Sequence, residues 1–416
     1  MFNRVLLSYR AFRSDLSAIR EGFQDIERRV GVLEAQDVLN PMAEFVAQRD
    51  ASDLDLHRRW IRSFRYGKQY DTAVSLANLC FGADGDVPAL RLERGYVFHE
   101  AGRYEEAVAD LREAAKDPAF AVEASLVADG AERKLGIDTS HSQRETMQAF
   151  FSPEKATFDA GSLDHIAVLE SLKTFGCAWI KGAFDPEPLT KFDQVIAQNI
   201  DGITSIYEEI GQAESFNVGF PLYMATAEKM AAQECFRDSY PELFDPAKMS
   251  GMDNKSLMKF VYRSMERLGL DGIVKDHLDM PELYTSASVC HIRNMMPNGS
   301  RSFGEFHQDN RLYNSDAEIL TLWFPFRYEH GPMSSLEFLP VRSQSHFPCV
   351  SACGIDNDLF DPEIFWRPEY KLGDVVLLSG FVPHRTYFEP EHTQERTSID
   401  VRFFNSELAE PIYQQA

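Results

Sequence analysis

The stretch "GDVVLLSGFVPHRTYFEP" (373–390) joins a turn, a buried strand and a histidine. Gly373-Asp374 is a typical turn pair, and residues 375–378 form a short apolar run. Similar runs, rich in β-branched or aromatic residues and bounded by turn residues, are "SASVCHIR" (286–293), "EILTLWFPF" (318–326), "SSLEFLPV" (334–341) and "TSIDVRFF" (397–404). This succession predicts a β-sandwich or small barrel from about residue 284 onward.

The residues before these strands favour helices. Segment 165–199 has the pattern of a helix, a short strand and a second helix. Asp185 is suited to cap the second helix, and Pro186 fits its first turn. We therefore expect one domain over 150–416, in which the helices of 150–280 pack on the outside of the β-structure.

Composition limits the classes of protein and partner. The chain has 416 residues, 44% of them apolar, which allows two or three domains with proper cores. Its net charge of -23 argues against nucleic acid and anionic membranes as partners, but permits an anionic small molecule held by local arginines.

No apolar run approaches the roughly 18 residues of a membrane span, and the N-terminus lacks the pattern of a secretory signal. Six scattered cysteines without a CxxC spacing favour reduced thiols and a cytoplasmic location.

The first 37 residues predict a coiled-coil helix. Large apolar residues alternate at spacings of three and four: Phe2, Val5, Tyr9, Phe12, Leu16, Ile19, Phe23, Ile26, Val30 and Leu33. This is the a/d pattern of a coiled coil, so we expect a homo-oligomer formed through residues 2–33. Packing of this helix on its own chain is the alternative, and the number of strands stays open.

Residues 41–136 predict tetratricopeptide-like helical repeats. "YGKQYDTAVSLANLC" (66–80) and "EAGRYEEAVADLREA" (100–114) match at an offset of 34 residues, which is the period of that repeat. "FAVEASLVADGAERKLG" (120–136) is expected to form a final capping helix. A protein-binding surface and plain internal packing are equally compatible with this segment.

A candidate metal site begins in "GEFHQDNRLYN" (304–314). On an extended chain, His307 and Asp309 would point to the same side, because residues i and i+2 share a face. Such pairs also arise by chance, and a second one occurs at His277-Leu278-Asp279. That pair lies in a helical pattern, where i and i+2 do not face each other, so we favour the first pair.

The third ligand is expected from the stretch 373–390. His384 follows the buried run 375–378, with His392 as the alternative. Two histidines and one carboxylate leave positions open on a metal, which is how ferrous iron binds a bidentate 2-oxo acid and oxygen.

An arginine near the C-terminus would hold the far end of that cosubstrate. Arg396 and Ser398 share one strand face, where a guanidinium and a hydroxyl can grip the distal carboxylate of 2-oxoglutarate. Arg402 lies on the same face and is the rival anchor, while Ile399, Val401 and Phe403 alternate onto the core. A structural ion pair, with Asp400 or a neighbour, is the remaining interpretation.

Together these motifs resemble the phytanoyl-CoA dioxygenase family of Fe(II)/2-oxoglutarate oxygenases over about 165–405. The resemblance rests on His-Gln-Asp, "LTLWFPF", "LEFLPVRSQSH", "PHRT" and "RTS". It implies a double-stranded β-helix (a jelly roll) with flanking helices, so the whole chain is expected to be a multidomain α plus β protein.

The resemblance also assigns roles to residues of this chain. It implies that His307, Asp309 and His384 hold Fe(II), and that His346 is no ligand. The implied 2-oxoglutarate-binding residues are Arg396, Ser398, Thr386 and Trp323. Candidate substrate-binding residues near the expected pocket mouth are Arg293, Asn310, Arg311 and Tyr313.

The expected activity is hydroxylation of a C–H bond with release of succinate and CO₂. The substrate would be a small molecule or a carrier-bound group, and an anionic one would suit the arginines. Two alternatives stay open: a repeat scaffold with a relic jelly roll, and a zinc hydrolase that uses the same three ligands.

Overall fold

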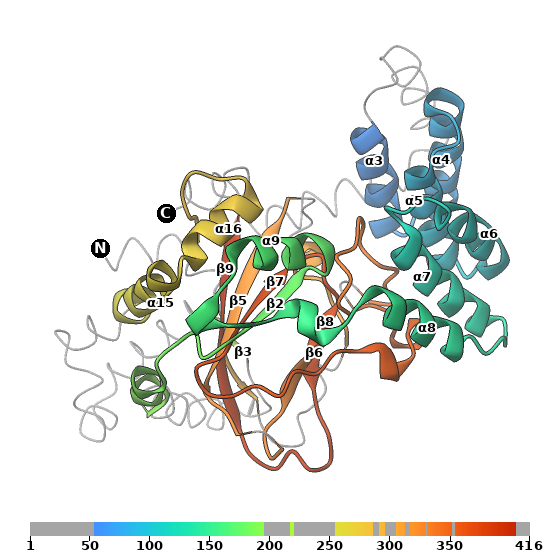
Figure 1. Cartoon of the computed structure of the whole chain (residues 1–416). Coiled ribbons are helices and arrows are strands. Elements are labelled where there is room, and N and C mark those ends of the chain that lie inside the picture. The colour runs from blue at the N-terminus through green and yellow to red at the C-terminus, as the bar shows by residue number, and fades with distance from the viewer. Residues whose placement is uncertain are drawn as a thin grey trace, which may run out of the picture.

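The computed structural model describes residues 54–194, 217–219, 254–285, 291–295, 305–312, 317–329, 331–351 and 354–404. The predicted coiled coil (1–37) and Tyr313 lie outside the described residues, so both expectations stay predictions. Figure 1 shows a mixed architecture, in which one group of helices lies beside a central β-sheet and other helices cover the sheet on its far side.

Within residues 54–150, six helices precede the sheet. They are α3 (Leu54–Tyr66), α4 (Tyr70–Asp84), α5 (Pro88–Glu100), α6 (Tyr104–Ala114), α7 (Ala121–Lys134) and α8 (Ser140–Phe150). Gly95 lets α5 and α6 approach closely, since a Cβ atom there would lie 2.7 Å from Cγ of Leu111. The tetratricopeptide assignment itself stays a prediction.

Helix α7 does not end this helical part as expected, because α8 follows it. Gln143 of α8 donates from Nε2 to the carbonyl oxygens of Leu126 in α7, at 2.7 Å, and of Leu359, at 2.9 Å. Its Oε1 accepts from the backbone N–H of Asp361 at 2.8 Å. These bonds tie the helices to a loop more than 200 residues later in the chain.

Among the described residues, the central sheet contains seven strands in the order β1-β2-β7-β5-β9-β4-β3, and a separate pair joins β6 to β8. The strands are β1 (Thr157–Asp159), β2 (Cys177–Lys181), β3 (Asn217–Gly219), β4 (His291–Met295), β5 (Ile319–Arg327), β6 (Ser335–Phe338), β7 (Val375–Ser379), β8 (His384–Tyr387) and β9 (Arg396–Phe404). All pairings are antiparallel except β1 with β2. The five predicted strand runs all contain strands, whereas the jelly-roll topology stays a prediction.

Further helices belong to the sheet-containing part. They are α9 (His165–Thr174), α15 (Asn254–Leu268), α16 (Leu270–Leu278) and the short α17 (Asp309–Leu312). Residues 186–194 are also helical, and the Asp185 carboxylate accepts from the N–H of Glu187 at 3.0 Å, as its predicted capping role requires. In the described part of the chain, no helix is long and apolar enough to cross a membrane.

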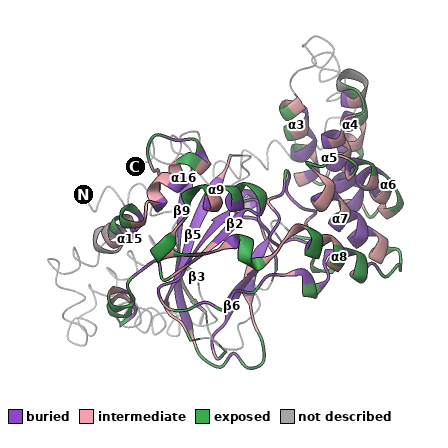
Figure 2. Cartoon of the chain, in the orientation of Figure 1, coloured by how far each residue is buried: buried purple, intermediate pink, exposed green. Residues whose placement is uncertain are grey.

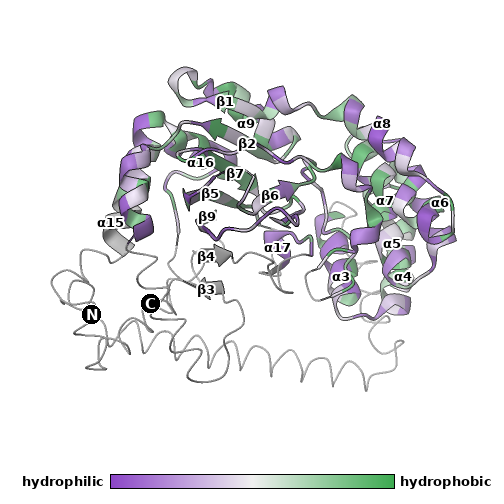
Figure 3. Cartoon of the chain, turned by 90° about the horizontal axis from the view of Figure 1, so that it is seen from below, coloured by the Kyte–Doolittle hydropathy of each residue, from purple (hydrophilic) through white to green (hydrophobic). Residues whose placement is uncertain are grey.

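The two faces of β9 have opposite chemistry, although all nine of its residues are buried. Ile399, Val401 and Phe403 join an apolar core with residues of α9, α15 and α16. This confirms the predicted alternation. Figure 2 shows that buried residues extend across the neighbouring strands β2, β5 and β9. Figure 3 shows apolar residues in β2 and β7, which belong to the same sheet and contribute to the same core. The polar residues of β9 therefore point to the opposite side of the sheet.

The helical part and the sheet part share a second apolar core. It combines residues of α5, α6, α7 and α8 with Phe306, Leu339, Phe347 and Leu359. Gly130 of α7 lies tightly against this loop, because a Cβ atom there would lie 2.7 Å from the carbonyl oxygen of Leu359. The helices are therefore packed directly against the chain that surrounds the candidate site.

Replacing Gly130 with Ala should destabilise this junction. Since the first obstacle is backbone, the helix or the loop must shift, and we expect a loss of about 1–3 kcal/mol in the free energy of unfolding. Gly272→Ala is the matched control, because nothing lies within 4 Å of a Cβ atom at that helical position. Urea unfolding would measure both, and equal midpoints for the two variants would contradict the tight contact.

Candidate metal centre

Two histidines from distant parts of the chain are held together by their backbones. The N–H of His307 donates to the carbonyl of His384, and the reverse bond also forms, each at 3.0 Å. His384 is the first residue of β8, and the centroids of the two imidazole rings lie 4.4 Å apart. An isolated antiparallel β-bridge between His307 and His384 therefore brings the two predicted histidines together.

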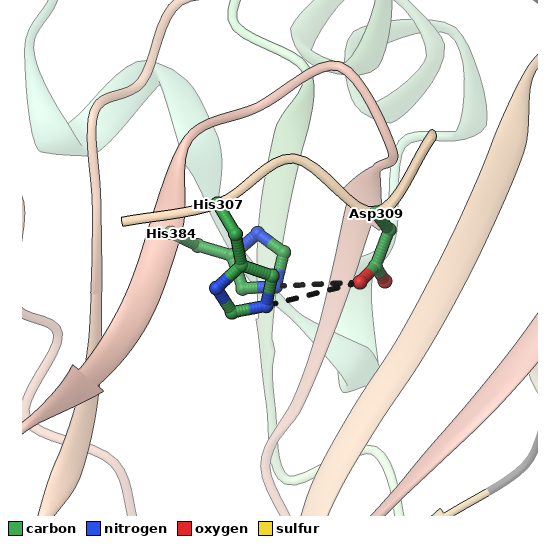
Figure 4. A group of neighbouring side chains, drawn as sticks. All are labelled: His307, Asp309 and His384. Carbon is green, nitrogen blue, oxygen red and sulfur yellow. Dashed lines mark ion pairs between the residues drawn. The ribbon is translucent and has the colours of Figure 1, made fainter. Parts of the chain in front are cut away.

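Asp309 completes a group of three ligand residues. Its Oδ1 lies 3.9 Å from Nε2 of His307 and 3.9 Å from Nε2 of His384. Figure 4 shows both ring nitrogens directed at this carboxylate, and the three ligand atoms all lie within 4.8 Å of one another. Such a cluster of two neutral imidazoles and one carboxylate can hold a divalent metal ion.

The other ring nitrogens support this orientation. Nδ1 of His384 lies 3.0 Å from the carbonyl oxygen of Val382, and Nδ1 of His307 lies 3.3 Å from that of Glu305. Because a carbonyl only accepts, each Nδ1 carries the proton and donates it. Each Nε2 then keeps its lone pair for a metal, which is the usual arrangement of a ligand histidine.

Asp309 itself is fixed by the sheet. Nε of Arg402 donates to Oδ2 at 2.9 Å, Nη2 donates to Oδ1 at 3.1 Å, and the Thr321 hydroxyl donates to Oδ2 at 2.9 Å. Burial alone would raise the pKa of the Asp309 carboxyl, but the charge and hydrogen bonds of Arg402 hold this pKa well below its usual range. The side chain is therefore a carboxylate, as a metal ligand must be.

The local backbone differs from the prediction. Asp309 is not on an extended chain beside His307 but opens the short helix α17. The two side chains still converge, because His307 is held by β8 while Asp309 is held by β5 and β9. The predicted pair is therefore present, but strand alternation is not what brings its members together.

A small cavity adjoins the three ligands. Its lining residues come from strands β5, β6, β7, β8 and β9 and the turn before α17: His307, Thr321, Trp323, Leu336, Leu378, His384, Thr386, Asp400 and Arg402. The space for the centre of a water-sized sphere is about 20 Å³, which suits about one water molecule. Trp323 and Thr386 line this cavity together with His307 and His384, and their assignment to 2-oxoglutarate binding stays a prediction.

Arg396 lies farther along the same face of β9 and contacts Trp323. Its guanidinium carbon is 5.4 Å from the centroid of that ring, and its Nη1 donates to the carbonyl of Ser334 at 3.1 Å. Trp323 in turn packs on Tyr370, with ring centroids 5.0 Å apart. A continuous wall therefore connects the metal ligands with the predicted anchor.

Three polar atoms of this wall have no hydrogen-bond partner within the described residues. They are Oγ of Ser398, Nε1 of Trp323 and the hydroxyl of Tyr370, all in fully buried side chains. Burial above all raises the pKa of Tyr370 well above its usual value, so this hydroxyl keeps its proton and can donate. Buried donors without acceptors are costly, and a bound carboxylate would supply the acceptors.

The four residues predicted at the pocket mouth have different environments. Arg293 in β4 lies opposite Ser398 in the strand register. Asn310 ties α17 to the Ala317 carbonyl, and Arg311 places its guanidinium 3.7 Å from the ring centroid of Tyr66 in α3. Neither Asn310 nor Arg311 lines the cavity described above, and Tyr313 is not described.

The rival histidines take other roles. His392, the alternative third ligand, is 6% exposed, and its Nδ1 accepts from the N–H of Glu389 at 2.8 Å. His277 lies near the end of α16, 3.8 Å from Glu318, in agreement with the helical pattern predicted for its segment. Neither belongs to a group of three ligand residues within the described part of the chain.

The role of Gln308, between the two ligands, was not predicted from the sequence. Its Nε2 donates to Oγ of Ser343 and to the carbonyl of Phe381, both at 2.7 Å, and its Oε1 accepts from the N–H of Phe347 at 2.8 Å. Gln308 therefore fixes the segment 343–347 against the metal centre. The amide in His-Gln-Asp was the only sequence signal for this contact.

The helical part holds the same segment from the other side. Arg58 and Arg65 donate to the carbonyls of Gln344 and His346, at 2.6 and 2.7 Å. Glu123 accepts from the N–H of Gln344 at 2.7 Å, and Tyr66 bonds to Nδ1 of His346. Internal packing, one of the two interpretations of the repeats, thus accounts for these contacts.

Comparison with known proteins adds limited information. No family model and no curated protein matches the chain. Among solved structures it is similar to EvdO2 from Micromonospora carbonacea var. aurantiaca complexed with 2-oxoglutarate (15% identity, TM-score 0.38, 59% of this chain and 92% of that chain). It is also similar to AviO1 from Streptomyces viridochromogenes Tue57 (12% identity, TM-score 0.35, 59% and 96%). Because these TM-scores are below 0.5, we assign nothing to the chain from these neighbours.

Replacing Glu123 with Gln should change how stability depends on pH. Burial raises the pKa of this carboxyl from 4.5 to about 7, so between these values the folded state binds more protons than the unfolded state. The contribution of Glu123 to the free energy of unfolding therefore falls as the pH rises from 4.5 to 7. Gln resembles the protonated acid and should stabilise the protein by about 1–3 kcal/mol at pH 8, but little at pH 4.5. Denaturant titrations at both pH values would test this, and an equal effect at both would contradict it.

Removing His384 should abolish tight binding of a divalent metal. We expect His384→Ala to weaken Co(II) binding, measured by calorimetry, by at least about 100-fold, because one of three ligands is lost. His392→Ala is the matched control, since it removes a buried histidine outside the cluster. Loss of binding in the control alone would identify His392 as the ligand instead.

Proposed function

We propose that the chain is an Fe(II)- and 2-oxoglutarate-dependent dioxygenase that hydroxylates a C–H bond. The observation that carries this proposal is the convergence of His307, Asp309 and His384 beside a wall of buried donors without acceptors. The ligand set fits ferrous iron, since two histidines and one carboxylate leave open positions for a bidentate cosubstrate and oxygen. The wall fits the far carboxylate of that cosubstrate.

Each residue of the wall has a proposed task. Arg396 and Ser398 bind the distal carboxylate of 2-oxoglutarate, to which a guanidinium supplies charged hydrogen bonds. Trp323 and Thr386 line the space between this carboxylate and the three ligands. Because the cavity has room for about one water, cosubstrate binding requires some of its lining side chains to move.

Other residues prepare the ligands. Arg402 and Thr321 hold Asp309 ionised and oriented, and the backbone bridge fixes both imidazoles. The buried walls exclude water from the reacting groups. When bound, iron, 2-oxoglutarate and oxygen supply the oxidising chemistry, in which 2-oxoglutarate yields succinate and CO₂ and the substrate gains a hydroxyl group.

The alternatives explain fewer observations. A zinc hydrolase would use the same three ligands but gives no task to Arg396 or to the unsatisfied donors of Ser398, Trp323 and Tyr370. A non-catalytic scaffold would not require all three ligand residues, nor two histidines whose Nδ1–H groups are hydrogen-bonded so that both Nε2 atoms can bind a metal. We retain a division at 1–37, 41–136 and 150–416, a homo-oligomer through residues 2–33 and a cytoplasmic location as parts of the proposal.

Anaerobic titration of the metal-free protein with Fe(II) and 2-oxoglutarate tests the proposal. Bidentate chelation should produce a weak visible charge-transfer band, which Arg396→Gln should shift to at least about tenfold higher 2-oxoglutarate concentration, because charged hydrogen bonds are lost. Arg263→Gln, an exposed position on α15, is the matched control. Absence of the band at saturating ligand, in a protein that binds Co(II), would refute the oxygenase assignment.

A further inference from the structure

A second cavity lies between α3 and the segment that follows β6. Its lining residues come from these two elements and from the turn after β7: Asp55, Arg58, Arg59, Arg62, Arg342, Ser343, Gln344 and Phe381. The space for the centres of water-sized spheres is about 240 Å³, far above the roughly 10–15 Å³ that one water requires. This cavity is large enough for a small polar ligand.

The charge of the lining is unusual for this chain. Four arginines and one acidic residue line the cavity, whereas the whole chain carries a net charge of -23. Two acids behind the wall offset part of the charge, since Glu93 pairs with Arg58 and Arg62, and Glu318 pairs with Arg342 at 2.5 Å. Within the described residues, the ion pairs of these arginines involve three carboxylates, those of Asp55, Glu93 and Glu318. The lining therefore concentrates guanidinium groups in an otherwise acidic chain.

The arginines are also held in place before any ligand binds. Arg58 donates to the Gln344 carbonyl at 2.6 Å, and the side chain of Arg62 is only 7% exposed. Arg342 comes from the opposite wall, where its guanidinium carbon lies 5.5 Å from the ring centroid of Phe381. Guanidinium groups that converge from two elements suit an anion with several oxygens, because each presents a planar pair of donors.

We propose that this cavity binds a phosphorylated small molecule. A phosphoryl group carries about two negative charges and three terminal oxygens, so it can use several guanidinium groups at once. Arg58 and Arg62 are largely buried and already hydrogen-bonded, so they lose little side-chain entropy on binding, which favours a specific site over diffuse attraction.

The cavity is a second site rather than part of the metal centre. The two cavities share no lining residue. Ser343 and Phe381 nevertheless connect them, because both are held by Gln308, which lies between His307 and Asp309. A ligand bound by the arginines would thus rest on the segment that supports the metal ligands. The binding proposal itself does not depend on the proposed oxygenase activity.

Calorimetric titration of the metal-free, full-length chain with pyrophosphate, at constant ionic strength, tests the proposal. We expect one saturable site, and an affinity at least about tenfold lower in Arg59→Gln, because a charged hydrogen-bond donor is lost. Arg59 is exposed, so its replacement should leave the fold intact, which circular dichroism would verify. Arg103→Gln, at the start of α6 and outside the cavity, should bind as the unmodified chain does.

Three outcomes would overturn the proposal. Binding that is absent, or that never saturates, would show that the arginines only stabilise the junction. Equal loss in Arg59→Gln and Arg103→Gln would indicate general surface attraction. Citrate binding as tightly as pyrophosphate would show that the site selects anionic charge and not a phosphoryl group.

Discussion

The ion pair between Arg402 and Asp309 is the contact on which the candidate metal centre depends. Both side chains are almost completely buried, at 2% and 1% exposure, and two N–H groups of the guanidinium meet the two carboxylate oxygens. A buried charge without a partner is strongly destabilising, so each residue fixes the other. Since Arg402 belongs to β9, the position of Asp309 is set by the register of the central sheet. The arginine also keeps the carboxylate ionised in surroundings that would otherwise favour its protonation.

A second constraint comes from the helical part. The segment 343–347 lies between Gln308 on one side and residues of α3, α5 and α7 on the other. The contacts include several buried charged groups, such as Glu93, whose two oxygens meet Arg62 and the Ser345 hydroxyl. Such networks are costly when incomplete, so displacement of the helices would disturb the segment and then Gln308. The metal centre is therefore supported from the sheet and from the helices, which gives the helical part a structural task close to the chemistry.

Local patterns were sufficient for much of the fold. Alternation along 396–404 predicted which side chains of β9 enter the core, and turn-bounded apolar runs predicted the strands, because both depend on neighbouring residues. Spacing also found the three candidate ligands. It did not find α17, the follow-on helix α8 or the pairing of Arg402 with Asp309, since these depend on parts far apart in the chain. The ion pair with Asp400, which the sequence had suggested, is present at 3.3 Å. Asn310 and Arg311 were expected at the pocket mouth because they neighbour Asp309, yet a short helix turns them toward Ala317 and Tyr66.

The same register decides between the two candidate anchors. Arg396 and Arg402 share a face of β9 but stand six residues apart, or roughly 20 Å along a strand. Arg402 already donates from Nε and Nη2 to Asp309, and Nη2 also approaches Asp400 at 3.3 Å. A guanidinium shared by two carboxylates offers little to a third. Arg396 instead lies beside Trp323, on the wall where Ser398 and Tyr370 carry unsatisfied donors, and a wall of donors is what a carboxylate ligand needs. In the proposed reaction the two arginines therefore have different roles. Arg402 orients the metal ligand Asp309, and Arg396 is placed to bind the cosubstrate.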